Sequence, residues 1–169
     1  HHFREGDYVV NMVMEEVHNM GIRDITICAS SLGKANDAIV PYIEDGTIVG
    51  IQSSGVRGKI GEAISTGKLR DLAIMRSHGG RVRAIETGEV HIDIAFIGAP
   101  TCDEYGNCTV HREIGPLDVT AMAQACKNSG GKVIVQVEKI VQGGTLDPKL
   151  VAIPGIYVDS VVVGTDEEN

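Results

Sequence analysis

The sequence contains no tryptophan, no CxxC pair and no apolar run near the roughly 20 residues that a membrane-spanning helix requires. No secretory signal opens it, and no serine nucleophile elbow occurs in it. These absences argue against a membrane-spanning protein and against a serine hydrolase. With no cysteine framework to suggest secretion, we expect the chain to work in the reducing cytoplasm.

The four cysteines do not predict a metal site. Cys28 and Cys126 sit in apolar patterns typical of small buried side chains. Cys102, Cys108 and His111 could ligate a metal, but their spacing fits no familiar zinc site and a fourth ligand is missing. We therefore predict no bound metal.

What the sequence has is an acidic, glycine-rich composition with one basic stretch. A net charge of −8 argues against nucleic acid and anionic membranes as partners. Residues 57–83 reverse this balance, with seven basic residues against two acids: Arg57, Lys59, Lys68, Arg70, Arg76, Arg81 and Arg83. Such a stretch suits a small polyanion, for example a phosphate-bearing cofactor, or equally a solvated basic face.

Helical and strand patterns alternate along the chain. The spacing of apolar residues and of glycines predicts helices at 7–21, 36–45, 59–66, 80–87 and from 118. β-Branched runs predict strands at 25–29, 47–51, 72–75, 92–97, 132–137 and 157–163, and the turn at 103–107 could return an edge strand through Thr109 and Val110. This order predicts one α/β domain over residues 1–169, with an open, largely parallel sheet and helices on both faces.

Three predicted strands are followed by loops rich in small residues, at 30–34, 53–61 and 76–81. Ligands of parallel sheets bind at the carboxyl ends of the strands, where glycines allow close backbone approach and helix N-termini attract anions. None of the loops is a Walker motif or GxGxxG. We predict a substrate or coenzyme A site formed by Ser31, Gly33, Ser54, Gly55, Arg57, Gly58, His78, Gly79, Gly80 and Arg81.

No catalytic residue can be assigned from these patterns. His78 could act as a general base, orient a substrate carboxylate or carbonyl, or simply bond to backbone. Glu44 and Glu86 each precede a small residue and a glycine, which is typical of a helix end rather than of a nucleophile. The chain therefore presents a predicted binding surface without a nucleophile.

Four segments together resemble the citrate lyase alpha chain family, the citrate CoA-transferase component: residues 1–7, 29–34, 50–64 and 76–107. Beyond residue 107 the sequence looks more like acetate, propionate and 3-oxoacid CoA-transferases, at 125–141, 144–148 and 153–159. Both families share an alpha-type CoA-transferase lobe. The family has a short histidine run before this Phe-Arg-Glu-Gly-Asp string, so His1 and His2 are expected to be native and a leading strand to be absent.

This resemblance implies a ping-pong exchange of a thioester between carboxylic acids. The nucleophilic glutamate is expected in a second lobe or subunit. Coenzyme A or an acyl-carrier thioester would be the substrate, with no permanently bound cofactor. The expected partners are that second lobe, citrate lyase beta and gamma (acyl carrier) chains, and small carboxylic acids, in an oligomer. A sugar-phosphate isomerase, an effector-sensing domain and a non-catalytic assembly lobe remain the alternatives.

Overall fold

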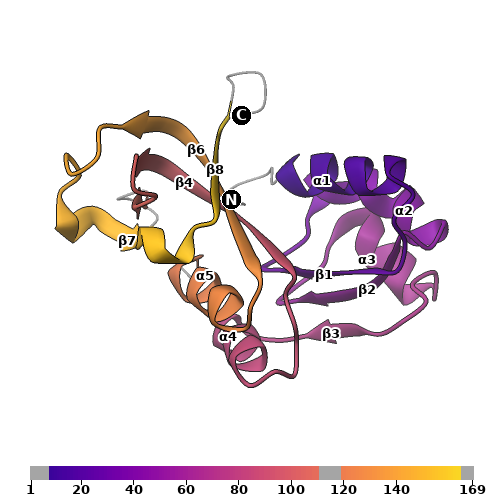
Figure 1. The fold of residues 1–169 in the computed structure, drawn as a ribbon. Coiled ribbons are helices and arrows are strands. Elements are labelled where there is room, and N and C mark those ends of the chain that lie inside the picture. The colour runs from indigo at the N-terminus through magenta and orange to yellow at the C-terminus, as the bar shows by residue number, and fades with distance from the viewer. Residues whose placement is uncertain (1–7, 111–118, 165–169) are drawn as a thin grey trace. The chain divides into compact units, whose positions relative to one another are not determined.

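The computed structural model describes residues 8–110 and 119–164, and the chain divides into two compact units, residues 1–81 and 82–169 (Figure 1). Each unit has its own sheet. The expected α/β class with open, largely parallel sheets is confirmed, but the strands form two sheets where the sequence predicted one. The single domain over 1–169 stays a prediction.

The first unit is built on three parallel strands in the order β1-β2-β3. The strands are β1 (Ile25–Ala29), β2 (Ile48–Ser53) and β3 (Ala73–Met75), and the helices are α1 (Tyr8–Asn19), α2 (Val40–Glu44), α3 (Gly58–Ser65) and α4 (His78–Glu86). Helix α4 runs on into the second unit. Apolar side chains from α1, α2, α3 and β2 share one buried core that includes Met14, Ile43, Ile51 and Ile60.

Proline shapes the segment before β2. The pattern at 36–45 predicted a helix that Pro41 would shorten or bend. The chain forms a 3-10 helix over Lys34–Ile39 and then α2, with Pro41 in its first turn. A proline has no N–H to donate and is tolerated only there, so the prediction is confirmed.

The second unit has five strands in the order β7-β5-β4-β6-β8. Its elements are β4 (Ile94–Asp103), β5 (Cys108–Thr109), α5 (Val119–Asn128), β6 (Lys132–Val141), β7 (Val151–Ile153) and β8 (Ser160–Val163). Strands β4, β6 and β8 are parallel, and β5 runs antiparallel to β4 and β7. Helix α5 packs on β4 and β6, and buries Ala123 and Cys126 against Val133 and Val135.

Element boundaries show where local patterns were insufficient. Strands β4 and β6 extend to residues 103 and 141, several residues beyond their predicted ends. Strand β7 was not predicted, because three residues between Pro148 and Pro154 carry no readable period. The last strand was predicted to begin at Tyr157, but that residue ends a 3-10 helix over Gly155–Tyr157 and β8 begins at Ser160. Asp7 and Asp118, where the first and last helices were predicted to begin, lie outside the described residues. No described helix has the length and hydropathy to cross a bilayer.

The predicted turn at 103–107 is confirmed and is organised by a buried carboxylate. Asp103, which is 4% exposed, accepts hydrogen bonds from the amides of Tyr105 and Asn107, both at 2.9 Å, and from Asn107 Nδ2 at 3.0 Å. Asn107 Oδ1 in turn accepts the Gly155 amide at 3.0 Å, where an added Cβ would lie 2.1 Å from the Tyr105 carbonyl oxygen. The turn thereby fixes the segment that follows β7.

Asp159 ties together three elements of the second unit. Its carboxylate accepts from Lys127 Nζ of α5 at 2.5 Å, from the Val133 amide of β6 at 2.9 Å and from Lys132 Nζ at 3.4 Å. The hydrogen bond from Lys127 is the largest cause that lowers the pKa of Asp159, to about 2. A carboxylate whose folded pKa is lowered stabilises the fold above its unfolded pKa, and this stabilisation is lost as the pH falls.

We therefore predict that Asp159→Asn has a lower urea midpoint than the wild type at pH 6, and that the two midpoints are nearly equal at pH 2. The wild-type midpoint should fall as pH drops from about 4, the ordinary aspartate pKa, toward 2. Urea unfolding followed by circular dichroism at both pH values measures this. An equal gap between the two proteins at both pH values would contradict it.

Candidate site at the carboxyl ends of β1, β2 and β3

The first two glycine-bearing loops lie side by side because the β1–β2 pairing continues past the strand ends. The Ser54 amide donates to the Ser30 carbonyl at 3.0 Å, and the Leu32 amide donates to the Gly55 carbonyl at 3.0 Å. The Arg57 amide then donates to the Leu32 carbonyl at 2.9 Å, and Leu32 and Val56 form an isolated parallel bridge. The two loops are therefore one rigid layer and not two independent turns.

The third loop is joined to this layer through two contacts. Its first residue, Arg76, donates its amide to the Ser53 carbonyl at 2.8 Å. The guanidinium of Arg81 reaches back to Ser30, with Nη2 donating to Oγ at 2.8 Å and Nη1 to the carbonyl oxygen at 3.4 Å. All three loops thus meet at the carboxyl edge of one sheet, as the sequence predicted.

Ser30 is the residue on which the loops converge. Its carbonyl accepts from the Ser54 amide, from the Ser54 hydroxyl in a short contact, and from the Ser53 hydroxyl at 3.4 Å. Arg81 bonds both its carbonyl and its hydroxyl. Ser30 was not among the predicted site residues, although its place directly after a strand was a signal that could have included it.

Arg81 differs from the expectation that it grips a ligand. It is only 1% exposed, and Nη2 lies 3.5 Å from Nδ1 of the exposed His78. A buried guanidinium bonded to Ser30 positions the loops rather than presenting a charge at the surface. Ser77, His78 and Gly79 are the exposed members of the third loop.

Most backbone amides of the three loops already donate hydrogen bonds within the chain. Besides those of Leu32, Ser54 and Arg57, the Gly33 amide donates to Asn36 Oδ1 at 3.2 Å. The Gly55 amide donates to the Ser53 hydroxyl at 3.2 Å, and the Gly80 amide to the Ser77 hydroxyl at 3.1 Å. Within residues 8–110 and 119–164, by contrast, the amides of Ser31 and Gly79 donate to no acceptor. In the second loop the amides of Val56 and Gly58 likewise donate to no acceptor among these residues, so backbone donors for a ligand remain in all three loops.

The start of α3 is occupied by a carboxylate of the same chain. Asp37 Oδ1 accepts the Lys59 amide at 2.8 Å. Gly58 adopts a positive φ of 66°, and an added Cβ there would lie 2.6 Å from the same oxygen. The sequence suggested that this helix start would attract an external anion, but Asp37 satisfies one of its free N–H groups. Asp37 was missed because it lies more than twenty residues earlier in the chain.

The basic stretch at 57–83 is not a single positive patch. Lys68 pairs with Glu44 at 2.6 Å, Arg70 with Asp24 at 2.5 Å, and Arg83 with Glu89 at 3.2 Å. For these three cations the reading as a solvated, ion-paired face is the better one. Two other cations of the stretch, Arg57 and Lys59, lie beside the joined loops, are exposed, and have no ion pair in the described part of the chain, and the same holds for Lys34 of the first loop.

The other residues considered as nucleophiles or metal ligands end helices, form ion pairs or lie buried between strands, apart from His111. Glu44 ends α2 and pairs with Lys68, while Glu86 ends α4 and is followed by Gly88 at a φ of 76°. Cys102 and Cys108 lie opposite each other across β4 and β5, where burial raises the pKa of both thiols. His111 lies outside the described residues, and no group of three metal-ligating side chains occurs among those that are described.

Comparison with known proteins decides the family. The family model described as "Citrate lyase, alpha subunit (CitF)" matches residues 1–164. The chain belongs to the citrate lyase alpha subunit family. The match passes well beyond residue 107, where the sequence analysis placed the end of the resemblance.

Individual relatives agree with this assignment. The citrate lyase alpha chain of Klebsiella pneumoniae is 50% identical over 107 residues, which are 63% of this chain and 21% of that protein. The alpha subunit of citrate lyase from Streptococcus mutans, solved in complex with citrate, has a TM-score of 0.83 at 40% identity and covers 97% of this chain and 32% of its own. The chain thus spans between a fifth and a third of the length of these members of the citrate lyase alpha subunit family.

The resemblance to other CoA-transferases is also confirmed. Acetate CoA-transferase YdiF of Escherichia coli K12 is 52% identical over 75 residues, 44% of this chain and 14% of that protein. A stretch of this chain is therefore shared with a CoA-transferase outside the citrate lyase alpha subunit family.

Proposed function

We propose that this chain is the alpha-type lobe of a citrate CoA-transferase, which moves a thioester from an acetyl group to citrate. The observation that carries the proposal is the convergence of three loops on Ser30 in a member of the citrate lyase alpha subunit family. Loops fixed by backbone pairing and by a buried guanidinium present donors and cations without reorganisation, which is what stabilises charge in a transition state.

The exchange proceeds by successive attacks on carbonyl carbons. A glutamate carboxylate of a second lobe or subunit attacks the acyl thioester, forming an acyl anhydride and releasing the thiolate. With free coenzyme A as the donor, as in the usual CoA-transferases, the thiolate then attacks the glutamyl carbonyl of the anhydride, giving a glutamyl thioester and releasing the first acid. The acceptor acid reverses both steps. Each attack builds negative charge on a carbonyl oxygen, and one donor at such an oxygen is worth about a hundred- to thousand-fold in rate.

In this proposal, different residues of the chain stabilise the oxyanion, bind the acid and position the loops. Amides of Ser31 and Gly79 are placed to donate to the developing oxyanion, and the exposed Arg57, beside Leu32 and Gly33, is placed to hold the acid carboxylate. Arg81 and Ser30 keep the loops in register. His78 lies next to them and orients the substrate carbonyl or carboxylate.

In this proposal the chain works in the cytoplasm together with other subunits. The second lobe or subunit supplies the nucleophile, and citrate lyase beta and gamma chains complete an oligomer in which the gamma chain carries the acyl thioester. Coenzyme A or that carrier is a substrate, so no cofactor is held permanently. All four cysteines are free thiols, which supports a reducing cytoplasm.

A covalent glutamyl thioester tests the function. The complete protein, with the subunits that co-purify with it, is mixed with acetyl-CoA and treated with borohydride or hydroxylamine, and the modified residue is found by mass spectrometry. We expect one glutamate to be modified, and citrate to be preferred over acetate and acetoacetate as acceptor. The isolated 169 residues should show no turnover. If the complete protein yields no sensitive intermediate, the transferase proposal fails.

We predict that Arg57→Ala raises the KM for the acceptor acid about tenfold in the complete protein, because a charge-assisted hydrogen bond to the carboxylate is lost. The fold should be unaffected, since the side chain is exposed. Steady-state kinetics with varied citrate measure the change, and Arg70→Ala, an exposed arginine paired with Asp24, is the matched control. Equal KM values for the two variants would place the acid elsewhere.

An isomerase of the same architecture is the alternative with a physical test. It requires a carboxylate base facing the loops. Asp37 is the carboxylate bonded to this edge, and it already accepts the Lys59 amide while crowding Gly58. Because Asp37 is already bonded to the backbone, it is poorly suited to act as a base, and this favours the transferase over the isomerase.

A further inference from the structure

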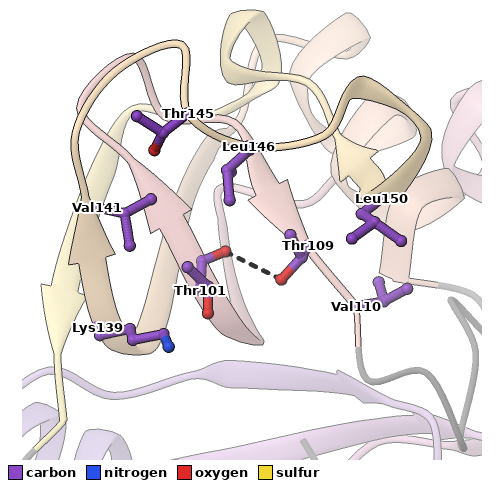
Figure 2. Close-up of a pocket in the computed structure, with 8 residues that line it drawn as sticks. All are labelled: Thr101, Thr109, Val110, Lys139, Val141, Thr145, Leu146 and Leu150. Atoms are coloured by element: carbon purple, nitrogen blue, oxygen red, sulfur yellow. Dashed lines mark hydrogen bonds between the residues drawn. The ribbon is translucent and has the colours of Figure 1, made fainter.

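We propose that the second unit contains a binding pocket for a short aliphatic monocarboxylate, formed where β4, β5 and β6 pass beyond the cover of α5. Figure 2 shows this pocket, which has a volume of about 450 Å³. That volume lies within the range of small-molecule sites in proteins. The proposal does not depend on the transferase function, because none of the residues that carry it belongs to the three loops.

The floor of the pocket is a row of side chains across three neighbouring strands. Thr101 of β4 is the direct partner of Lys139 of β6, and the Thr109 hydroxyl of β5 donates to the Thr101 carbonyl at 3.4 Å. Lys139 and Val141 continue the alternation of Val133, Val135 and Val137, which are buried under α5. The pocket is thus an extension of the core face beyond the part that α5 covers.

The walls come from the segment after β6. Leu146 and Leu150 lie over this end of the sheet, on a segment whose start is bonded to the turn after β4 and whose end is held by a local turn. The Gly143 amide donates to Glu104 Oε2 at 2.9 Å, and the Lys149 amide donates to Asp147 Oδ1 at 3.0 Å. A wall anchored in this way leaves the pocket formed before a ligand arrives, which lowers the entropic cost of binding.

The lining of the pocket combines a cation, hydroxyls and aliphatic side chains. In Figure 2, Thr101 stands at the centre with Lys139 below it, Val141, Leu146 and Thr145 lie above it, and Leu150 lies to the right. Within the described residues, Lys139 has no ion pair and the Thr101 hydroxyl has no hydrogen bond. An exposed, unpaired ammonium in a chain of net charge −8 is a place for an anion.

The ligand class follows from this arrangement. One ammonium and one hydroxyl match the two oxygens of a carboxylate, whereas a phosphate dianion would call for further cations. The aliphatic side chains Val141, Leu146 and Leu150 offer only apolar contact, so the other end of the ligand is a hydrocarbon tail. A carboxylate with a short unbranched chain satisfies both ends.

Isothermal titration calorimetry of the 169-residue chain with hexanoate tests the pocket, and hexylamine of the same length is the control ligand. We expect hexanoate to bind and hexylamine to show no heat above dilution. Lys139→Gln should weaken hexanoate binding about tenfold, as should Leu146→Ala, because one removes the cation and the other removes part of the tail contact. Lys149→Gln, an exposed lysine on the same segment, is the matched control and should bind as wild type.

The outcomes are separable from the transferase proposal. Hexanoate binding that survives Lys139→Gln but is lost in Arg57→Ala would assign the acid to the three loops and overturn the pocket. Equal binding of hexanoate and hexylamine, or no binding of hexanoate, would overturn it as well. Lys139 is exposed, so its variant should keep the wild-type circular dichroism spectrum, and the comparison does not depend on a folding defect.

Discussion

Arg81→Ala should lower the free energy of unfolding by about 3 kcal/mol, and the transferase kcat/KM of the complete protein about 100-fold. The guanidinium is 1% exposed and makes the two bonds to Ser30 that attach the third loop to the other two. Arg81→Ala removes the packing of the buried stem and both bonds to Ser30, so the third loop keeps its backbone bond from Arg76 to Ser53 but loses the side-chain contact that fixes its position. A misplacement of about 1 Å is sufficient for a rate loss of this size.

Thermal unfolding and steady-state kinetics measure the two effects. For a chain of this length, about 3 kcal/mol corresponds to a Tm lowered by about 6–12 °C. Kinetics are taken well below that Tm, so that a loss of rate reports on the folded protein. Arg83→Ala on the same helix is the matched control. That side chain is exposed and paired only with Glu89, so its removal should cost less than about 0.5 kcal/mol.

A double-mutant cycle isolates the contact itself. Ser30→Ala removes the hydroxyl that Arg81 Nη2 bonds at 2.8 Å but leaves the backbone carbonyl in place. The effects of Ser30→Ala and Arg81→Ala should therefore be less than additive. Strict additivity, or an Arg81→Ala protein that behaves like Arg83→Ala, would show that the arginine does not hold the loops.

Asp103→Ala should lower the free energy of unfolding by about 3 kcal/mol or more, because three N–H groups of Tyr105 and Asn107 are left without their acceptor. Asp103→Asn keeps the shape of the side chain but removes its charge, so its cost should be smaller, about 2 kcal/mol. Glu138→Gln, an exposed carboxylate on β6, should have no measurable effect. Urea unfolding at pH 7 measures all three.

The effect of Asp103 depends on pH in a defined direction. Burial alone would raise its pKa, but hydrogen bonds from Asn107, Tyr105 and Gly144 outweigh it, and the pKa is lowered. The carboxylate therefore stabilises the fold above its unfolded pKa of about 3.9, and this stabilisation declines as the pH falls below that value. The difference between wild type and Asp103→Asn should shrink in acid. A constant difference would show that the charge is not what the turn requires.

Short-range sequence signals predicted many of the helix and strand boundaries. Strand β1 matches its predicted bounds, α3 and β3 lie within one residue of theirs, and the turn at 103–107 returns the edge strand as expected. Glycines at helix ends and β-branched runs act over a few residues, so a single sequence displays them. The division into two sheets was not visible, because every strand pattern is compatible with one sheet or two.

The sequence by itself determined that this is an α/β chain of the citrate lyase alpha subunit family, with three glycine-bearing loops at strand ends. Tertiary structure alone decided how those loops are used. It turned Arg81 inward to Ser30, placed Asp37 at the start of α3, and left Lys139 beside an uncovered stretch of the core face. Such contacts join residues that lie twenty to fifty positions apart. Which side chain reaches which backbone group depends on how the strands pair, and no local pattern records that.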